Sequence, residues 1–523
     1  MDRAKAVAGG FHVSSQTIRR GTDHFVRQLG SGLLSDGTAL LQVPSYVTSL
    51  PNGTEKGSKA AIPADLVTAK TYRDLFGFIA RHTEVFMQEH MPGPLDSWRC
   101  IVKDGQVTDE LRRQRLHPLG FTFSFTFNQH AINKGTLMYW TKAFNINDAV
   151  GRDPCAMLQE ALDELHLPLL VTALVNDTVG TLAARAYASP GRSETLLGAI
   201  FGTGTNGAYV EKMTNIKKLH SHPGFADPGK AESMALNTEW GGFDKELSVL
   251  PTTIYDEALD RASVNPGDQH YEKRISGLYL GELLRRVILA EMQSLTPCFS
   301  MSAPSDSRLH IPYSIDSSFL SMLVRDQSPT LERAREDISK VLSVSQPSVA
   351  DAAALQVIAG AIGERAARLS AIAIAGIVVQ SGRLSSTPLL KGPSLRMMTT
   401  RPSFLARLWS ACRMALGTVM GCIHHFFHTE KVKSDSTSQE VSSDLSYSSE
   451  EGKWDVSSEV DMIDIGVDGS LFEFFPGFED HVRTALREIP AIGPLGEQRI
   501  QMGTAPDGSG VGAALIAWAS KKT

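Results

Sequence analysis

The sequence has little that would favour export, insertion into a membrane or binding of nucleic acid. Its five cysteines are scattered and form no CxxC pair, which favours a reducing compartment over a disulfide framework. The longest uncharged apolar candidate, AIAIAGIVV at 371–379, is too short to cross a membrane and predicts a buried helix. With 51 Lys and Arg against 57 Asp and Glu, the net charge of -6 gives no global positive field that would attract nucleic acid.

The N-terminus also lacks the apolar core that a secretory signal needs, because residues 1–10 carry charges and glycines. Together with the scattered cysteines, this predicts an intracellular, cytoplasmic protein and leaves a nuclear or mitochondrial-surface location open. A chain of 523 residues with 42% hydrophobic residues is long and apolar enough for two or more domains with sizeable cores.

Periodic patterns predict alternating helices and strands. Apolar residues such as Ile18, Phe25 and Leu29 predict an amphipathic helix over 17–34, ended by the glycines at 30 and 32, and residues 71–90 predict another. Apolar runs at 167–175 and 196–201 predict strands on either side of a helix over 178–188. This alternation predicts an α/β fold.

Residues 382–461 interrupt this pattern. Their second half is rich in Ser, Asp and Glu, has few core-forming residues and is predicted to be disordered. The first half predicts a basic amphipathic helix around Trp409, which covers the protein's own flank or docks on a membrane surface or a partner. The cluster of Cys422, His424, His425 and His428 has no second pair of ligands nearby, so we predict no metal site.

The segment LPLLVTALVNDTVGT contains the first candidate for chemistry. Its apolar strand ends abruptly at Asn176 and Asp177, and a helix begins there. Ligands of open α/β sheets bind outside the carboxyl ends of the strands, which is where the Asp177 carboxylate would lie. Asp177 could equally cap the helix, and this segment alone leaves both interpretations open.

Three glycine-containing turns are candidates for phosphate binding. Gly202, Gly204 and Gly207 satisfy GxGxxG, but a strand follows them, so they predict the tip of a hairpin whose N–H groups can hold phosphate oxygens. Residues 468–470 form a turn between a strand and an amphipathic helix that begins near Pro476, and residues 508–510 lie just before an apolar helix. Several such turns in a chain that also has a carboxylate after a strand indicate a nucleotide bound in a cleft.

Longer motifs resemble eukaryotic hexokinases of the fungal type. They include PLGFTFSF (118–125), YWTKAF (139–144), LVNDTVGT (174–181), FGTGTNGAY (201–209), ALNTEWGGFD (235–244), YEKRISGLYLGELLRR (271–286), ERAARL (364–369), VDGSLFEFFPGF (467–478) and DGSGVGAAL (507–515), in the family's order. The resemblance implies an α/β, two-domain actin-like and ribonuclease-H-like ATPase fold with the active site in the interdomain cleft. It implies MgATP-dependent phosphorylation of a hexose, glucose above all, at the 6-hydroxyl, with Mg²⁺ held through the ATP phosphates.

The resemblance also implies roles for individual residues. Asp177 would be the general base that takes the proton of the 6-hydroxyl, with Lys142 as the second catalytic residue. Carboxylates, amides and hydroxyls suit the alternating donors and acceptors of a sugar. The implied hexose contacts are Ser124, Thr141, Lys142, Asn176, Asp177, Asn206, Glu239, Gln269 and Glu272. The implied ATP contacts are Gly202, Thr203, Gly204, Thr205, Asp468, Gly469, Ser470, Gly508, Ser509 and Gly510.

The same resemblance implies the domain boundaries. We expect an N-terminal helix and part of the large domain at 1–57, a truncated small domain at 58–177 and the large domain at 178–381. The low-complexity insert follows at 382–461, the adenosine segment of the large domain at 462–502, and a C-terminal helix that returns to the small domain at 503–523.

One family element is missing from the sequence. Hexokinases carry a strand-turn-strand with the phosphate loop DLGGTN soon after the segment that PNGTEKGS (51–58) resembles, and here that segment runs directly into KAAIPADL. Each lost charge-assisted hydrogen bond to phosphate removes roughly 1.5 to 3 kcal/mol. The loss of two strands should also expose a sheet edge in the small domain. Either the rest of the chain has adapted or the sequence lacks a coding segment.

Smaller departures affect the sugar-contacting part. Thr126 stands where the family usually has proline, and residues 100–115 form an extra stretch that is either a surface loop or retained non-coding sequence. Two functions therefore stand side by side: an ATP:hexose 6-phosphotransferase, and a catalytically weak or inactive glucose-binding regulator of carbon metabolism. The acidic, serine-rich insert would suit the regulator because it could accept phosphate or recruit a regulatory protein.

Overall fold

The computed structural model describes residues 1–47, 62–140, 144–189, 194–220, 231–384, 462–505 and 508–520. Three parts that the sequence analysis singled out lie outside the described residues. They are the segment PNGTEKGS, the predicted sugar contacts Thr141 and Lys142, and nearly all of the insert, with its predicted basic helix and its Cys/His cluster. In the part of the chain that is described, no helix is long and apolar enough to span a membrane. No group of three or more His, Cys, Asp or Glu side chains there could hold a metal ion.

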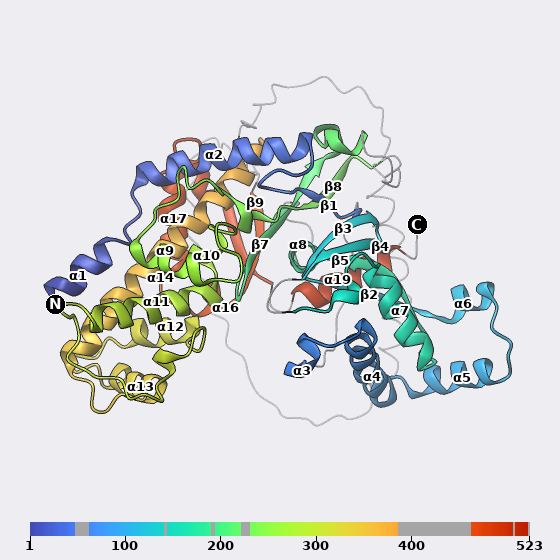
Figure 1. Ribbon diagram of the computed structural model, residues 1–523. Helices are drawn as coiled ribbons and strands as arrows, with labels where there is room; N and C mark the ends of the chain where they lie inside the picture. The colour runs from blue at the N-terminus through green and yellow to red at the C-terminus, as the bar shows by residue number, and fades with distance from the viewer. Residues whose placement is uncertain are drawn as a thin grey trace, which may run out of the picture. The chain divides into compact units, whose positions relative to one another are not determined.

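The structure alternates helices and strands along the chain (Figure 1). The helices before the insert are α1 (Asp2–Gly9), α2 (Ser15–Leu34), α3 (Ala64–Val67), α4 (Tyr72–His90), α5 (Pro92–Lys103), α6 (Asp109–Arg115), α7 (Pro154–Glu164), α8 (Asp177–Ala188), α9 (Ile254–Ala262), α10 (Glu272–Ile275), α11 (Gly277–Met292), α12 (Ser317–Arg325), α13 (Glu332–Leu342) and α14 (Val349–Gln380). After the insert come α16 (Ser470–Phe474), α17 (Phe478–Arg487), α18 (Gly493–Gln498) and α19 (Gly508–Ser520).

The larger sheet has the order β1-β8-β7-β6-β9-β10. Its strands are β1 (Val43–Pro44), β6 (Thr195–Phe201), β7 (Thr205–Lys212), β8 (Ser233–Asn237), β9 (Ile463–Asp468) and β10 (Ile500–Thr504). Strands β6, β9 and β10 run parallel, whereas β1, β8, β7 and β6 pair antiparallel in turn. Because β6 and β9 run parallel, the predicted phosphate hairpin after β6 and the predicted turn after β9 lie at one edge of the sheet.

Small residues let α8 lie close to one face of this sheet. A Cβ placed on Gly198 of β6 would lie 2.4 Å from the backbone nitrogen of Leu182, and one on Gly466 of β9 would lie 2.5 Å from the Cβ of Arg185. Real Cβ atoms do not approach other atoms so closely, so glycine is required at both positions. The close contact fixes the N-terminus of α8, which carries Asp177, relative to the ends of the strands.

The long helix α14 forms the centre of the main core. It contacts α1, α2, α12 and α17 (Figure 1), and its segment Ala371–Val378 is fully buried, as the sequence predicted for this stretch. The sheet side chains Leu197, Tyr209 and Leu236 belong to the same buried cluster. The sheet is thus covered on both faces, which explains why its inner strand β6 reads as a nearly continuous apolar run.

The remaining strands form two separate pairs among the described residues. β2 (His117–Thr122) pairs parallel with β5 (Leu169–Val175), and β3 (Thr126–Ala131) pairs antiparallel with β4 (Lys134–Tyr139). Two-stranded pairs are marginal without further support. Here α19 packs on β2 and β5, and a separate buried cluster around Phe76, Phe123 and Leu158 supports the pairs.

Several local predictions need correction. The helix over 17–34 does not end at Gly30 or Gly32: α2 continues to Leu34, and Gly32 instead makes room for the carbonyl oxygen of Leu40, 2.2 Å from where a Cβ would lie. Residues 100–115 are a surface loop only at 104–108: the rest belongs to α5 and α6, where the Thr108 hydroxyl caps α6 and Arg112 pairs with Asp163. The short helix α16 precedes the predicted amphipathic helix, which begins at Phe478.

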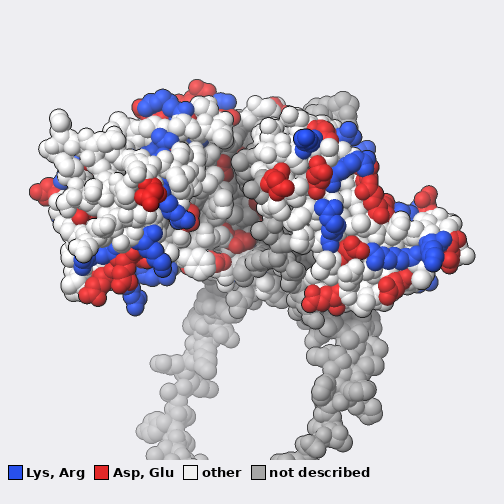
Figure 2. All heavy atoms as spheres, turned by 60° about the horizontal axis from the view of Figure 1, so that its bottom comes forward, with Lys and Arg blue, Asp and Glu red and all other residues white. Residues whose placement is uncertain are grey.

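The described surface carries both signs of charge. Figure 2 shows Lys and Arg side chains interspersed with Asp and Glu on the face it draws. Many of these charges pair locally, as Arg73 does with Glu160 and Glu164. Such exposed pairs each contribute at most about 1 kcal/mol.

Candidate functional site

The N-terminus of α8 positions the first candidate carboxylate. Asn176 is the N-cap, and its side-chain oxygen accepts hydrogen bonds from the Thr178 backbone N–H at 3.0 Å and the Thr178 hydroxyl at 2.7 Å. Asp177 is the first residue of the helix, is half-buried and accepts a bond from the Thr178 N–H at 2.8 Å. Since Asn176 already caps the helix, Asp177 is not needed as the cap, which weakens the purely structural interpretation of its carboxylate.

Three polar side chains meet where β7 begins and β8 ends. The Asn206 amide donates to the side-chain oxygen of Asn237 at 2.7 Å and lies 3.4 Å from Glu239 Oε1. The Asn237 amide donates to the same Glu239 oxygen at 2.6 Å. Glu239 itself has a left-handed backbone with φ of 52°, which is unfavourable for a residue with a side chain. Non-glycine residues keep such a conformation where their surroundings enforce it, often at functional sites.

Gln269 and Glu272 join this group from the next segment of the chain. A Cβ placed on Gly241 would lie 2.3 Å from Gln269 Oε1, so the Gln269 amide lies directly against the turn that follows Glu239. Glu272 Oε1 is 3.4 Å from the backbone nitrogen of Thr205 and 2.9 Å from where a Cβ on Gly204 would lie. Two more of the predicted sugar contacts thus lie beside the start of β7.

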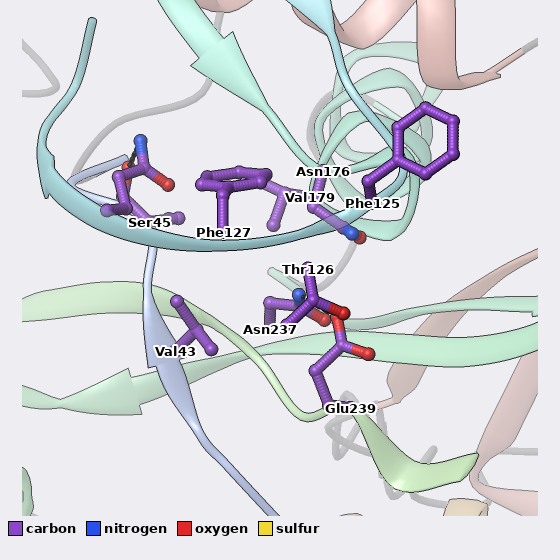
Figure 3. A pocket seen from close by; sticks show the side chains of 10 residues that line it. Val43, Ser45, Phe125, Thr126, Phe127, Asn176, Val179, Asn237 and Glu239 are labelled. Carbon is purple, nitrogen blue, oxygen red and sulfur yellow. Dashed lines mark hydrogen bonds between the residues drawn. The ribbon is translucent and has the colours of Figure 1, made fainter. Parts of the chain in front are cut away.

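A small cavity connects these side chains to the other group of strands (Figure 3). Its lining residues are Val43, Ser45, Phe125, Thr126, Phe127, Gln129, Asn176, Val179, Asn237 and Glu239. Thr126 and Glu239 thus line the same cavity although they lie far apart in the sequence. The cavity volume of about 10 Å³ is close to what one water molecule needs.

Tyr139 lies at the edge of this group, whose charges affect the pKa of its hydroxyl. Its ring is half-exposed, and its hydroxyl hydrogen-bonds with Thr126. Burial raises the pKa of Tyr139, and the nearby charges of Glu239 and Asp268 raise it further. The phenol is therefore neutral near pH 7 and can donate a hydrogen bond.

The predicted phosphate hairpin is present and is fixed by a helix. β6 and β7 pair antiparallel, and Phe201 faces Thr205, so Gly202, Thr203 and Gly204 form the tip. The first N–H groups of α11 donate to this tip, from Gly277 to the Gly202 carbonyl at 2.8 Å and from Leu278 to the Thr203 carbonyl at 3.1 Å. Gly207 was predicted to lie at the tip, and this is wrong: it lies within β7, where a Cβ would lie 2.2 Å from the Trp240 ring.

The two other predicted ATP segments lie next to parts of this site. Gly469, with φ of 116°, follows β9, and a Cβ there would lie 2.5 Å from the carbonyl of Phe201, just before the hairpin tip. Gly508, Ser509 and Gly510 are not before α19 but are its first residues. A Cβ on Gly180 would lie 2.5 Å from the Ser509 carbonyl oxygen, so the start of α19 lies one helical turn from Asp177.

These segments are compatible with a bound nucleotide. A Cβ on Gly469 would lie 2.7 Å from the Gly202 backbone nitrogen, so a side chain is excluded there, and a Cβ on Gly510 would meet no atom within 4 Å. The N-terminus of a helix such as α19 favours an anion. The start of α19, with the open space at Gly510, thus suits a phosphate group.

The structure brings most of the predicted residues together, with exceptions. Ser124 lies between β2 and β3, next to cavity-lining Phe125, whereas Thr141 and Lys142 are outside the described residues. Sequence reasoning missed Asn237 as a site residue, although it bonds to both Asn206 and Glu239. The signal was available: Asn237 follows the apolar strand MAL just as Asn176 follows LLVTALV.

Comparisons with protein families and known proteins agree on one family. Two family models, both described as hexokinase, match residues 196–519 and residues 3–63 with 58–187. The second match consists of two segments that meet at 58–63, next to the point where the sequence lacks the expected phosphate loop. A glucokinase of Aspergillus niger is 38% identical and covers 100% of this chain and 97% of its own length. Glucokinase-1 of Saccharomyces cerevisiae is 31% identical and covers 98% of this chain and 95% of its own length.

The structural comparison gives the fold. A hexokinase from Schistosoma mansoni, solved in complex with glucose, superposes with a TM-score of 0.69 at 24% identity and covers 99% of this chain and 98% of its own. A second solved hexokinase gives a TM-score of 0.64. The predicted two-domain, actin-like α/β fold is therefore confirmed.

Proposed function

The chain belongs to the hexokinase family, and we propose that it transfers the terminal phosphoryl group of ATP to the 6-hydroxyl of a hexose, glucose being the first candidate. The observation that carries this proposal is the hydrogen-bonded group of Asn206, Asn237 and Glu239 beside Gln269 and Glu272. These side chains offer both donors and acceptors, which is what a ring of hydroxyl groups requires. The names of the relatives, glucokinases and hexokinases, support the same substrate.

Asp177 acts as the general base in this proposal. It lies at the start of α8, next in sequence to cavity-lining Asn176, and accepts the proton of the 6-hydroxyl. The oxygen of that group attacks the terminal phosphorus of ATP, the bond from this phosphorus to the bridging oxygen breaks, and ADP leaves. Glu239, Asn206 and Asn237 hold the other hydroxyls and so orient the reacting one. Bound MgATP supplies the phosphoryl group, and the hairpin tip at Gly202–Gly204 with the segments at 468–470 and 508–510 holds it. The roles of Ser124, Thr141 and Lys142 as sugar contacts remain part of the proposal.

Closure around the substrate is part of the same proposal. Because the cavity has room for about one water molecule, the segment that carries Phe125, Thr126 and Phe127 opens to admit the sugar and closes over it. Closure excludes water, which strengthens the interactions of Asp177 and prevents the transfer of phosphate to water.

The experiment is a coupled assay on the full-length chain with saturating glucose and MgATP, and the position of the phosphate is then read by NMR. We expect glucose 6-phosphate to form at a rate well above that of the same reaction mixture without the protein. No product at saturating substrates would overturn the kinase assignment.

A second candidate function is favoured by the missing phosphate loop. The strands β2–β5 and β3–β4 form separate pairs, and the sequence has no glycine-rich replacement for the loop. A chain that keeps the sugar-binding group but holds ATP poorly would act as a glucose-binding regulator, with residues 382–461 as the contact to a regulatory partner. Binding of glucose, seen as a higher melting temperature, without any turnover would favour this function.

The cellular location is proposed from the cysteines. Cys100, Cys155 and Cys298, the cysteines among the described residues, are unpaired thiols. Unpaired thiols suit a reducing compartment, so we propose that the protein acts inside the cell.

A further inference from the structure

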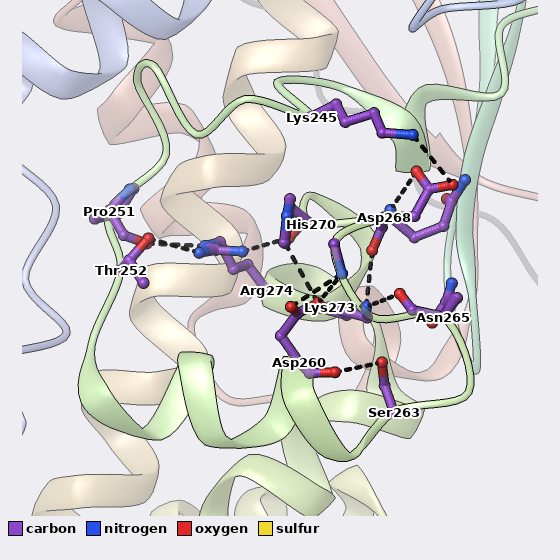
Figure 4. A network of polar contacts seen from close by, with 12 residues as sticks. Lys245, Pro251, Thr252, Asp260, Ser263, Asn265, Asp268, His270, Lys273 and Arg274 are labelled. Carbon is purple, nitrogen blue, oxygen red and sulfur yellow. Dashed lines mark hydrogen bonds and ion pairs between the residues drawn. The ribbon is translucent and has the colours of Figure 1, made fainter.

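The loop that carries Gln269 and Glu272 is tied together by one buried cation. The Lys273 side chain is 3% exposed, and its ammonium group donates to Asp260 Oδ1 at 2.7 Å, to the Asn265 carbonyl at 2.7 Å and to the Asp268 carbonyl at 2.8 Å (Figure 4). An ammonium group has three donors, and all three are used here. The loop is thus closed from the inside by Lys273.

Asp260 completes this clamp from α9. Its carboxylate accepts from the backbone nitrogen of Gly267 at 3.1 and 3.0 Å and lies 3.7 Å from the His270 ring. Burial would raise the pKa of Asp260, but the hydrogen bonds from Lys273 and Gly267 lower it below its ordinary value. Asp260 is therefore charged near pH 7, and together with Lys273 it holds the loop at residues 265, 267 and 268.

The clamp determines the conformation of the predicted sugar contacts. Gln269 has a left-handed backbone with φ of 54°, its N–H donates to the Asp268 carboxylate at 2.9 Å, and its carbonyl accepts from the Lys273 N–H at 3.0 Å. Such a backbone persists only when neighbouring contacts enforce it. Glu272 directly precedes Lys273 and lies beside Thr205, so any shift of Lys273 also moves the Glu272 carboxylate.

We propose that Lys273 and Asp260 are positioning residues for hexose binding: neither touches the sugar, and together they hold Gln269 and Glu272 in the conformation that binds it. The inference rests on the proposed function, because Gln269 and Glu272 are sugar contacts only in that proposal. Interactions that bind substrate and transition state equally change KM and leave kcat nearly unchanged. Loss of the clamp therefore weakens sugar binding more than it slows the reaction.

The test compares the variant Lys273→Met with the variant Lys245→Met and with the parent chain. Lys245 is a matched control because it is 54% exposed and pairs only with the Asp268 carboxylate, at 3.8 Å, on the surface of the same loop. We expect Lys273→Met to raise the glucose Kd, measured by calorimetry, and the glucose KM by about ten- to a hundredfold, since misplacement of binding groups by about 1 Å has effects of this size. The kcat stays within about threefold, and Lys245→Met resembles the parent.

Asp260→Asn serves as the second variant, because it keeps the shape of the side chain and removes only its charge. It should raise the glucose Kd less than Lys273→Met does, and it decides the question if Lys273→Met does not fold. Hydrogen exchange of residues 265–272 in the sugar-free protein should be faster in both variants and unchanged in Lys245→Met. This readout does not depend on the proposed function.

The possible failures are distinguishable. If the parent chain binds glucose and both clamp variants bind it with the same Kd, the positioning role is wrong although the sugar site is right. A lower melting temperature with unchanged Kd and KM would show a purely structural role and would also overturn the proposal. If the parent chain itself binds no glucose, the sugar site is wrong and the positioning role falls with it.

Discussion

The carboxylate of Asp177 is the side chain on which turnover depends in the proposed reaction. The change Asp177→Asn removes the base but keeps the size of the side chain, and Asn176 continues to cap α8. We expect kcat to fall by about 10²- to 10⁴-fold, the usual contribution of general base catalysis, with the glucose Kd changed little. Asp480→Asn, an exposed position on α17, is the control and should keep full activity. Equal kcat values for the two variants would contradict the assignment of the base.

A buried ion pair in the main core makes a prediction about stability. Asp256 accepts from Arg365 at 2.8 Å, and the Arg365 side chain is fully buried and lies over the Phe11 ring. Asp256→Asn leaves the Arg365 charge without its partner and should lower the free energy of unfolding by about 3–5 kcal/mol. The exposed pair of Arg261 and Glu257 is the control, and Glu257→Gln should change the free energy by less than about 1 kcal/mol.

The effect of Asp256→Asn should depend on pH in a defined direction. Burial would raise the pKa of Asp256, but the charge and hydrogen bond of Arg365 outweigh it and lower this pKa from its ordinary value of 3.8 to about 2. A lowered pKa stabilises the folded state above the unfolded-state pKa, and this stabilisation is lost as the pH falls through the folded-state value. Urea unfolding at several pH values should therefore show a constant difference between parent and variant above pH 4 that shrinks towards pH 2. A difference that grows at low pH would contradict the ion pair.

Single residues of the site were predicted from sequence mainly through the resemblance to a family. Asn206 and Glu239 lie in segments that resemble hexokinase motifs, and Asn176 was singled out also because it directly follows an apolar strand. Asn237 was overlooked, although an Asn directly after an apolar strand is the same signal that identified Asn176. The clamp of Lys273 and Asp260 was not predictable, because its contacts join residues 260, 265, 268 and 273 through a loop whose path only the structure gives.

The position of the base Asp177 relative to the nucleotide segment 508–510 depends on the contact between the helices α8 and α19. A Cβ on Gly512 would lie 1.9 Å from the Gly180 carbonyl oxygen, so Gly512→Ala must push the two helices apart. We expect a loss of about 1–3 kcal/mol in the free energy of unfolding, as overpacking usually causes, and a lower kcat because Asp177 moves relative to residues 508–510.

Gly30→Ala is the matched control for this helix substitution. Gly30 also lies within a helix, α2, but a Cβ there would meet no atom within 4 Å. Because alanine favours helices, Gly30→Ala should stabilise the protein by up to about 1 kcal/mol. Thermal unfolding and the coupled assay measure both substitutions. The proposed close packing of α8 against α19 would be wrong if both substitutions changed the free energy of unfolding in the same direction.

At the scale of elements, sequence patterns located the long periodic helices and the buried strands well. The predicted helix over 71–90 corresponds to α4 at Tyr72–His90, and the predicted strand at 196–201 to β6 at Thr195–Phe201. Glycines were harder to interpret, since a glycine can end a helix or allow close packing within one. Gly32 does the second, and only the position of Leu40 against α2 distinguishes the two.

At the scale of the whole chain, the two ends of the insert are held by one residue. The Arg499 guanidinium donates to the carbonyls of Leu384 and Arg383 at 3.1 and 3.0 Å, and the Arg499 carbonyl accepts from the Ile463 N–H at 2.7 Å. The long insert thus enters and leaves the fold at a single anchored place.

This anchoring predicts that the insert is not needed for folding. Replacement of residues 387–459 with a short Gly/Ser linker should change Tm by less than about 4 °C, which corresponds to about 1 kcal/mol or less for a domain of moderate size. Arg499→Ala in the full-length chain should lower Tm more than the replacement does, because it releases both ends. An insoluble linker variant, or one that melts far below the parent, would contradict the anchoring.

The order of the strands could not be derived from local patterns. Each pattern indicates a strand, but the pairing of β6 with β9 joins segments on either side of the insert and depends on contacts across the whole fold. Only the resemblance to a family supplied this arrangement. The split into the pairs β2–β5 and β3–β4 agrees with the missing segment after residue 58, an absence that the sequence itself shows.

The most direct test of the account is calorimetric titration of the parent chain with glucose in the absence of ATP, repeated with Glu239→Gln. We predict a single site with a Kd within about 1 µM to 1 mM, the usual range for enzyme substrates, and at least about tenfold weaker binding by the variant. No heat of binding at millimolar glucose, or the same Kd for both proteins, would contradict the claim that Asn206, Asn237, Glu239, Gln269 and Glu272 form a sugar site.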